Sequence, residues 1–139
     1  MKIAVVDGQG GGLGKTIIEK LSKEMGEAVH IIALGTNAMA TAAMLKAGAN
    51  EAATGENAIV VNANKVDIII GSVGVLAANS MLGEFTPKMA EAIGSSSARK
   101  ILIPLNRCNL EIIGTGAASL PNLIELLVLR VKELSDPVR

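Results

Sequence analysis

Short apolar runs alternate along the chain with glycine-rich turns and with segments in which apolar residues recur at helical spacing. The first run, residues 2–6, has the length of a buried strand and stops at Asp7. From Leu13 onward, apolar residues recur every four positions, as on one face of a helix. The opening of the chain therefore predicts a strand, a loop and a helix, with glycines at their junction: Gly8, Gly10, Gly11, Gly12 and Gly14.

The rest of the chain continues this alternation. The pattern predicts strands over residues 28–34, 66–70 and 100–105, and helices over residues 38–46, 58–64, 87–93 and 119–134. Residues 110–113 can return as an antiparallel strand at the C-terminal edge of the sheet. Because strands separated by helices need right-handed crossovers, this order predicts an α/β fold with a mainly parallel sheet. We expect a single three-layer domain over residues 1–139, of the Rossmann-like or flavodoxin-like kind.

A glycine loop between a strand and a helix is suited to binding a phosphate. Glycine lets the backbone approach a ligand closely, because there is no Cβ atom in the way. The free N–H groups and the positive dipole end at a helix N-terminus attract anions. The alternative is that the glycines serve only the close packing of the helix on the strand. The density of glycine favours a binding role.

The loop resembles the dinucleotide-binding motif without matching it. The motif G-x-G-x-x-G fails from either starting glycine, whereas a form that is one residue longer, Gly8-x-Gly10-x-x-x-Gly14, fits. In NAD-binding domains, an acidic residue at the end of the second strand holds the ribose hydroxyls. Here residues 35–37 (Gly-Thr-Asn) stand at that position, so the contact is neutral, adapted to a 2′-phosphate, or absent.

Two other motifs fit in part. The ATP-binding P-loop matches residues 14–16 (Gly-Lys-Thr), but Gln9 stands where its first glycine belongs. In the deviant P-loop of partitioning and metal-insertion ATPases, Gly10 takes the place of the extra lysine. The cobalamin-binding motif D-x-H-x-x-G aligns with Asp7 and Gly12, with Gln9 in place of the metal-binding histidine. The loop can therefore be interpreted as a dinucleotide-binding loop, a degenerate P-loop for ATP, or a loop of the cobalamin-binding kind.

The loops that follow parallel strands meet at one edge of the sheet, where ligands of such folds bind. Four strand ends close with Gly, Asn, Ser or Thr, which indicates one shared site. Lys15 and Arg107 are the candidate cations for a phosphate. The predicted cofactor-binding residues are Asp7, Gly8, Gln9, Gly10, Gly11, Gly12, Leu13, Gly14, Lys15, Thr16, Gly35, Thr36, Asn37, Gly71, Ser72, Val73, Gly74, Asn106 and Arg107.

Catalytic chemistry is not indicated by any residue pattern. The single cysteine, Cys108, would be a nucleophile only if Arg107 or a helix terminus stabilised its thiolate. The single histidine, His30, lies within a predicted strand, so no Cys-His pair is evident. One cysteine and one histidine also give no zinc-binding spacing.

Composition limits the partners and the location. Thirteen basic and thirteen acidic residues cancel, which argues against nucleic acid or an anionic membrane as a partner. The chain starts directly in a strand, and no apolar run approaches the roughly 18 residues of a membrane span, so we expect a cytoplasmic protein. Leu126 and Leu129 project from the face of the last helix opposite its apolar stripe, which predicts a subunit contact in a homo-oligomer.

Four segments of the chain resemble a family of short, functionally uncharacterised bacterial proteins with a Rossmann-like fold. They are residues 6–15 (VDGQGGGLGK), 33–38 (ALGTNA), 54–59 (TGENAI) and 103–109 (IPLNRCN). This resemblance implies the fold and supplies no substrate or catalytic residue. The leading hypothesis is a small nucleotide-binding protein, most readily for NAD(P), with the phosphates at residues 8–15. The alternatives are an ATP-binding protein with a degenerate P-loop, and a non-enzymatic oligomeric module of the cobalamin- or flavodoxin-like kind.

Overall fold

The computed structural model describes residues 1–105, 109–116 and 118–136. In this part of the chain the strands are β1 (Lys2–Asp7), β2 (His30–Gly35), β3 (Glu51–Thr54), β4 (Ile68–Ser72) and β5 (Arg99–Ile103). The α-helices that follow them are α1 (Gly12–Met25), α2 (Ala38–Lys46), α3 (Glu56–Asn62), α4 (Pro87–Ser95) and α5 (Leu120–Ser135). Two 3-10 helices follow α1 and β4, namely η1 (Gly26–Ala28) and η2 (Val73–Leu76).

The strands form one parallel sheet in the order β3-β2-β1-β4-β5. The chain runs outward from the central strand β1 through β2 to β3, crosses back to β4, and runs outward again to β5. The direction of the strand order therefore changes between β1 and β4. In open parallel sheets, this is where ligands bind. The predicted α/β fold with a parallel sheet is confirmed.

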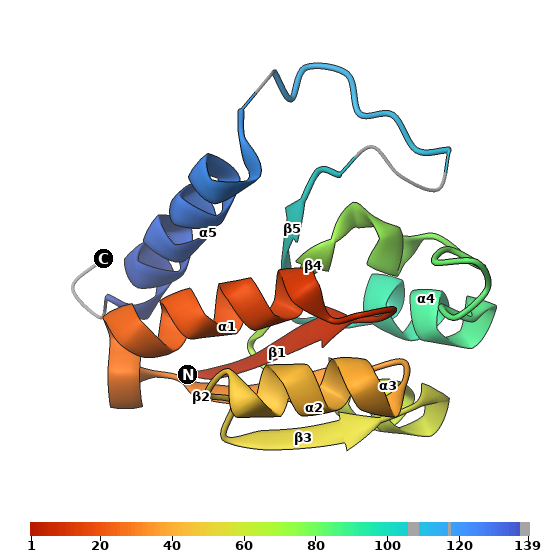
Figure 1. The fold of residues 1–139 in the computed structure, drawn as a ribbon, viewed down its shortest axis with the longest axis horizontal. Helices are drawn as coiled ribbons and strands as arrows, with labels where there is room; N and C mark the ends of the chain where they lie inside the picture. Colours follow the sequence, from red (N-terminus) through yellow and green to blue (C-terminus); the bar gives the residue numbers. More distant parts are fainter. Residues whose placement is uncertain (106–108, 117, 137–139) are drawn as a thin grey trace.

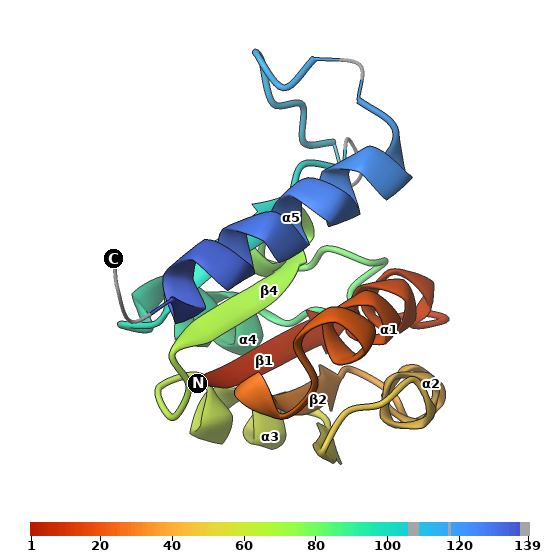
Figure 2. The same cartoon turned by 90° about the vertical axis from the view of Figure 1, so that its left-hand side faces the viewer.

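Helices cover both faces of the sheet (Figures 1 and 2). One apolar core joins the sheet to α1, α2 and α5, and a second core joins the other face to α3 and α4. Alternate residues of β1 serve the two cores, because successive side chains of a strand point to opposite faces. Ile3 and Val5 lie in the first core, and Ala4 and Val6 lie in the second. Residues 3–6 of β1 are all apolar, as expected for a strand that is buried on both faces.

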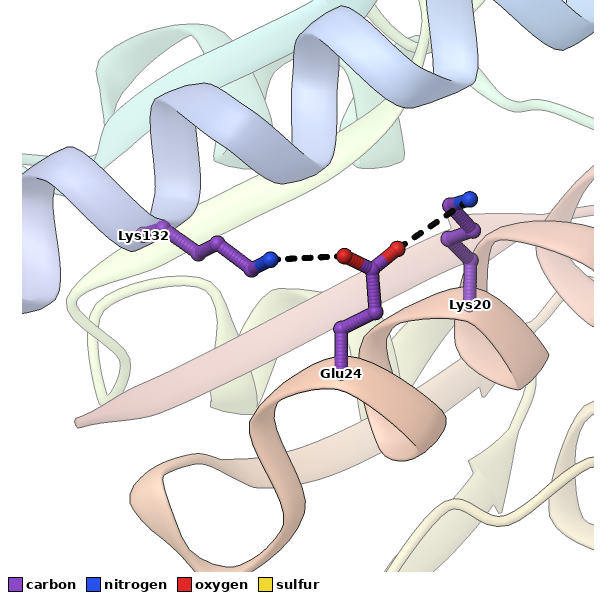
Figure 3. A network of polar contacts seen from close by, with 3 residues as sticks. All are labelled: Lys20, Glu24 and Lys132. Atoms are coloured by element: carbon purple, nitrogen blue, oxygen red, sulfur yellow. Dashed lines mark hydrogen bonds and ion pairs between the residues drawn. The ribbon is translucent and has the colours of Figure 1, made fainter.

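An ion pair links α5 to α1 at the surface of the first core, and a second pair within α1 shares its glutamate (Figure 3). Glu24 Oε1 lies 2.6 Å from Lys132 Nζ, and Glu24 Oε2 lies 3.1 Å from Lys20 Nζ. The hydrogen bond from Lys132, followed by that from Lys20, holds the pKa of the Glu24 carboxyl below its ordinary value. All three side chains are partly exposed, so these two pairs contribute little to the free energy of unfolding.

Two predictions about the sheet are wrong. Residues 51–54 form the edge strand β3, where no strand was predicted, because its Glu-Ala-Ala-Thr sequence contains no apolar run. Residues 110–113 form no strand, and the sheet of the described residues is parallel throughout. Ile113 is 88% exposed, and Gly114 follows it with a φ of 92°, which is incompatible with a continuing extended strand.

The predicted helices after the first are close to those observed, and side-chain caps mark the start of three of them. The side chains of Asn37, Thr86 and Ser119 accept backbone hydrogen bonds at the start of α2, α4 and α5. Leu126 and Leu129 are 60% and 49% exposed on α5, as expected. Within the described part of the chain, no helix has both the length and the apolar content that crossing a membrane requires.

Candidate functional site

The connection from β1 to α1 is a tight turn at the carboxyl edge of the sheet. The Gly11 N–H donates to the Gly8 carbonyl over 2.9 Å, and α1 begins at the next residue, Gly12. Gly11 has a φ of 73° and Gln9 has a φ of 50°, so both lie in the left-handed region. Residues 8–11 thus reverse the local backbone direction and bring the N-terminus of α1 to the end of β1.

The Asp7 carboxylate fixes this turn from inside. Its Oδ1 accepts the Gly8 N–H over 2.8 Å, and its Oδ2 accepts the Gly14 N–H over 2.7 Å. The last residue of β1 is therefore tied to the first turn of α1. The Gly14 amide, which the sequence analysis assigned to a phosphate, is used by the protein itself.

The glycines of the loop fall into two groups. A Cβ atom at Gly11 would lie 2.8 Å from the Ala40 Cα, and one at Gly14 would lie 2.5 Å from the Met44 Sδ. Packing against α2 therefore requires glycine at these positions. A Cβ atom at Gly10 or Gly12 would meet nothing within 4 Å. Packing explains the first group and leaves the second without a structural reason.

A cavity of about 650 Å³ lies beside the loop. Its walls are the β1–α1 loop, the segment after β4, and residues near the ends of β5 and α5. The cavity thus occupies the position between β1 and β4 where the strand order changes direction. Its volume falls within the roughly 300–1,000 Å³ of typical small-ligand sites.

Three backbone amides at the cavity wall have no hydrogen-bond acceptor among the described residues: those of Gly10, Gly12 and Leu13. Gly12 and Leu13 are the first two residues of α1, whose N–H groups have no partner within the helix. The positive end of the α1 dipole adds to their attraction for an anion. This part of the wall is therefore suited to a phosphate or carboxylate group.

The opposite side of the loop, toward β2, is occupied by a carboxylate. Glu84 Oε1 accepts hydrogen bonds from Gln9 N at 2.9 Å, Thr36 Oγ1 at 2.6 Å and Asn37 Nδ2 at 2.8 Å. The Thr36 hydroxyl, then the Gln9 amide and the Asn37 side chain, hold the pKa of Glu84 below its ordinary value. The carboxylate is therefore charged at neutral pH.

The structure places the predicted site residues in three groups. Those that line the cavity are Asp7, Gly8, Gln9, Gly10, Gly11, Gly12, Leu13, Ser72 and Gly74. Those that are described but do not line it are Gly14, Lys15, Thr16, Gly35, Thr36, Asn37, Gly71 and Val73. Asn106 and Arg107, together with Cys108, lie outside the described residues.

Several of the predicted residues outside the cavity have other roles. The Lys15 side chain is 55% exposed, with its Nζ 4.0 Å from Glu19 Oε1. The Thr16 hydroxyl donates to the Gly12 carbonyl over 3.0 Å. A Cβ atom at Gly35 or Gly71 would come within 3 Å of a neighbouring atom, so packing requires glycine there.

Some lining residues escaped the sequence analysis. Met81 and Leu82 line the cavity, whereas the nearby Phe85 is fully buried in the second core. The other lining residues that the predicted set lacks are Ala77, Ala78, Asn79, Ser80, Leu105, Asn109 and Leu120. Three non-glycine residues of this segment, Asn79, Met81 and Leu82, have φ values of 57–65°. Methionine and leucine give no sequence signal for this conformation, and one asparagine was not enough to predict the loop.

The described walls of the cavity combine polar and apolar groups. Its described walls offer amides, hydroxyls, the Asp7 carboxylate and apolar side chains, and no Lys, Arg or His is among them. His30 lies at the opposite, amino end of β2, where its Nε2 is 2.6 Å from Glu51 Oε2. Among the residues that the structure describes, no three His, Cys, Asp or Glu side chains form a group that could hold a metal ion.

Comparisons with known proteins agree with this fold. No curated protein matches the chain. A solved structure from Escherichia coli O157:H7, a dodecameric FMN-dependent UbiX-like decarboxylase, is similar with a TM-score of 0.50 and 13% sequence identity. The similarity covers 96% of this chain and 94% of that one, and at this identity it shows a common fold alone. A family profile matches residues 2–136, and the chain therefore belongs to the family described as "Domain of unknown function (DUF3842)".

Proposed function

We propose that this protein binds a phosphate-bearing nucleotide in the cavity between β1 and β4. The phosphate lies against the amides of Gly10, Gly12 and Leu13, and the rest of the ligand extends toward the segment after β4. The observation that carries the proposal is the set of three amides without an acceptor among the described residues, at a helix N-terminus that opens on a cavity. No described cation is needed, because backbone amides and the helix dipole supply the attraction.

An FMN-like mononucleotide fits this site best. Met81, Leu82, Leu105 and Leu120 give the cavity apolar walls beside its polar loop, which suits a flat ring joined to a phosphate. The similar structure from Escherichia coli is described as FMN-dependent, which makes FMN the first probe to use. In this arrangement the protein binds and orients the ligand, and the redox chemistry of a flavin would come from the flavin itself.

NAD(P) is the second candidate. The strand order β3-β2-β1-β4-β5 is the order found in the core of dinucleotide-binding domains, and the lengthened glycine motif favours the same ligand. ATP bound through a P-loop is less well supported. The P-loop lysine and threonine would be Lys15 and Thr16, and neither lines the cavity.

Calorimetry and thermal melting test the proposal directly. FMN, NADH, NADPH and ATP with magnesium are each titrated into the wild type and into Gly12→Val. A ligand at 100 times its dissociation constant should stabilise the wild type by about 2.7 kcal/mol. Valine at Gly12 should weaken FMN binding at least about tenfold, because its side chain covers the amides. The matched control is Gly94→Val, since Gly94 is also helical, exposed and free of close neighbours. The proposal fails if none of the four nucleotides binds, or if the two variants bind FMN equally.

We also propose that α5 contacts a second copy of the chain. Leu126 and Leu129 are exposed apolar residues on this outer helix, and the similar structure from Escherichia coli is described as dodecameric. Replacing both leucines with lysine should reduce the solution mass toward that of one chain, as measured by light scattering. A wild type that is already monomeric would contradict this contact.

A further inference from the structure

Glu84 is held in place by a short loop that is anchored in the second core. The Asn79 N–H donates to the Phe85 carbonyl over 2.8 Å, and the Phe85 N–H donates to the Ser80 carbonyl over 3.1 Å. Phe85, which follows Glu84 in the chain, is fully buried. The backbone at Glu84 is therefore fixed by the loop.

The Glu84 carboxylate uses the polar groups at the end of β2. It accepts the Thr36 hydroxyl over 2.6 Å and the Asn37 side-chain amide over 2.8 Å. It also accepts the Gln9 amide of the glycine loop over 2.9 Å. A negative charge from a distant segment thus lies where the β1–α1 and β2–α2 connections meet.

The space between the glycine loop and β2 is filled. A Cβ atom placed on Gly8 would lie 2.6 Å from Thr36 Oγ1, 2.7 Å from Met81 Sδ and 3.3 Å from Glu84 Oε1. The cavity ends before this point, because neither Glu84 nor residues 35–37 line it. The cavity is therefore open toward β4 and closed toward β2.

A dinucleotide would have to occupy the filled space between the glycine loop and β2. In dinucleotide-binding domains of this strand order, the adenosine ribose lies at the end of the second strand. To place a ribose there, this protein would have to displace Glu84 and lose its bonds to Thr36 and Asn37. A 2′-phosphate at the same place would also face the negative charge of the carboxylate.

We propose that Glu84 is a specificity-determining residue that restricts the cavity to mononucleotides by closing the glycine loop on the side of β2. This inference rests on the proposed nucleotide-binding function. It goes beyond that function because it names the size of the ligand and the residue that limits it.

The test compares the affinities for FMN, NADH and NADPH, measured by calorimetry on the full chain. The wild type should bind FMN at least about tenfold more tightly than either dinucleotide. Glu84→Ala should raise the ratio of NADH affinity to FMN affinity at least about tenfold, because it removes the obstruction. Glu84→Gln keeps the shape of the side chain and removes its charge. It should therefore raise the ratio of NADPH affinity to FMN affinity more than the ratio of NADH affinity to FMN affinity. Glu91→Ala, an exposed glutamate on α4, is the matched control.

The outcomes separate this inference from the proposed function. Wild-type protein that binds NADH as tightly as FMN overturns the role of Glu84 and leaves nucleotide binding intact. The same conclusion follows if FMN binds and both Glu84 variants keep the wild-type affinity ratios. If FMN, NADH and NADPH all fail to bind the wild type, both the proposed function and this inference are overturned. Thermal melting of each variant shows that it is folded before its ratios are compared.

Discussion

The glycine loop faces β2 on one side and β4 on the other, and the backbone amides on these two sides differ in their hydrogen-bond acceptors. Toward β2, the Gln9 amide is bound by the carboxylate of Glu84. Toward β4, the amides of Gly10, Gly12 and Leu13 open on the cavity and have no acceptor among the described residues. One loop is thus closed by the protein's own anion on one side and open to an external anion on the other.

This difference shows that a count of glycines does not identify a binding surface. Gly11 and Gly14 are adjacent in space to α2 and leave no room for a side chain. Gly10 and Gly12 have room for one and lie where a ligand would approach. The glycines that packing does not require are the ones to associate with ligand binding.

The largest expected effect is the difference in stability between valine variants of a packed glycine and of an open glycine. Gly11→Val should lower the free energy of unfolding by about 3 kcal/mol, since it adds a left-handed φ penalty to a clash with the Ala40 backbone. Gly12→Val should lower it by less than about 1 kcal/mol, because its Cβ meets nothing. Urea denaturation measures both. Equal losses in the two variants would remove the distinction between the packed and the open glycines.

An intermediate effect is expected at Asp7, which holds the loop from inside. Asp7→Asn replaces one of the two acceptor oxygens with an N–H₂ group, which would face the amide of Gly8 or of Gly14. We expect the free energy of unfolding to fall by about 1–3 kcal/mol, as measured by urea denaturation. The control is Asp67→Asn, because Asp67 is exposed and accepts a backbone hydrogen bond from Lys2. A loss at Asp7 no larger than that at Asp67 would contradict this account of the loop.

The smallest effect is the pH dependence that Glu84 gives to stability. Hydrogen bonds from Thr36, Gln9 and Asn37 depress its folded-state pKa, so its contribution is present above the ordinary value of 4.5 and is lost as the pH falls through the folded value. The difference in melting temperature between the wild type and Glu84→Gln should therefore shrink between pH 6 and pH 3. Solvent screening keeps this effect small. Glu91→Gln should show no such trend. A difference in melting temperature that stays constant with pH for Glu84→Gln would contradict the role of the Glu84 carboxylate on the β2 side of the loop.

Most of the fold could be predicted from the sequence, because local signals mark most of its elements. The apolar run before Asp7, the cap at Asn37 and the Thr86-Pro87 opening of α4 each have a local physical cause. Strand β3 could not be predicted, since Glu51–Thr54 becomes a strand only by pairing with β2. Residues 110–113 show the converse, because an apolar run without a partner strand remains irregular.

The lining of the cavity was predictable at the ends of β1 and β4, because glycine and serine stand at the ends of these strands in the sequence. Residues 7–13, which the glycine loop predicts as ligand-binding residues, line the cavity. The opposite wall depends on the left-handed residues Asn79, Met81 and Leu82, of which only the asparagine belongs to a residue type that favours turns. Glu84 could not have been found, because its partners Thr36 and Asn37 lie nearly fifty positions away in the chain. Long-range hydrogen bonds of this kind leave no periodicity in a single sequence.

The most direct test of the central claim is a nuclear magnetic resonance titration of glycine-labelled protein with FMN. Labelling with ¹⁵N-glycine makes the amides of Gly8, Gly10, Gly12 and Gly14 separately observable, with Gly94 on α4 as an internal control. The account predicts that the Gly10 and Gly12 signals shift most, that Gly8 and Gly14 shift less because Asp7 holds them, and that Gly94 stays in place. Saturating FMN that moves only signals outside the loop, or none, would contradict it.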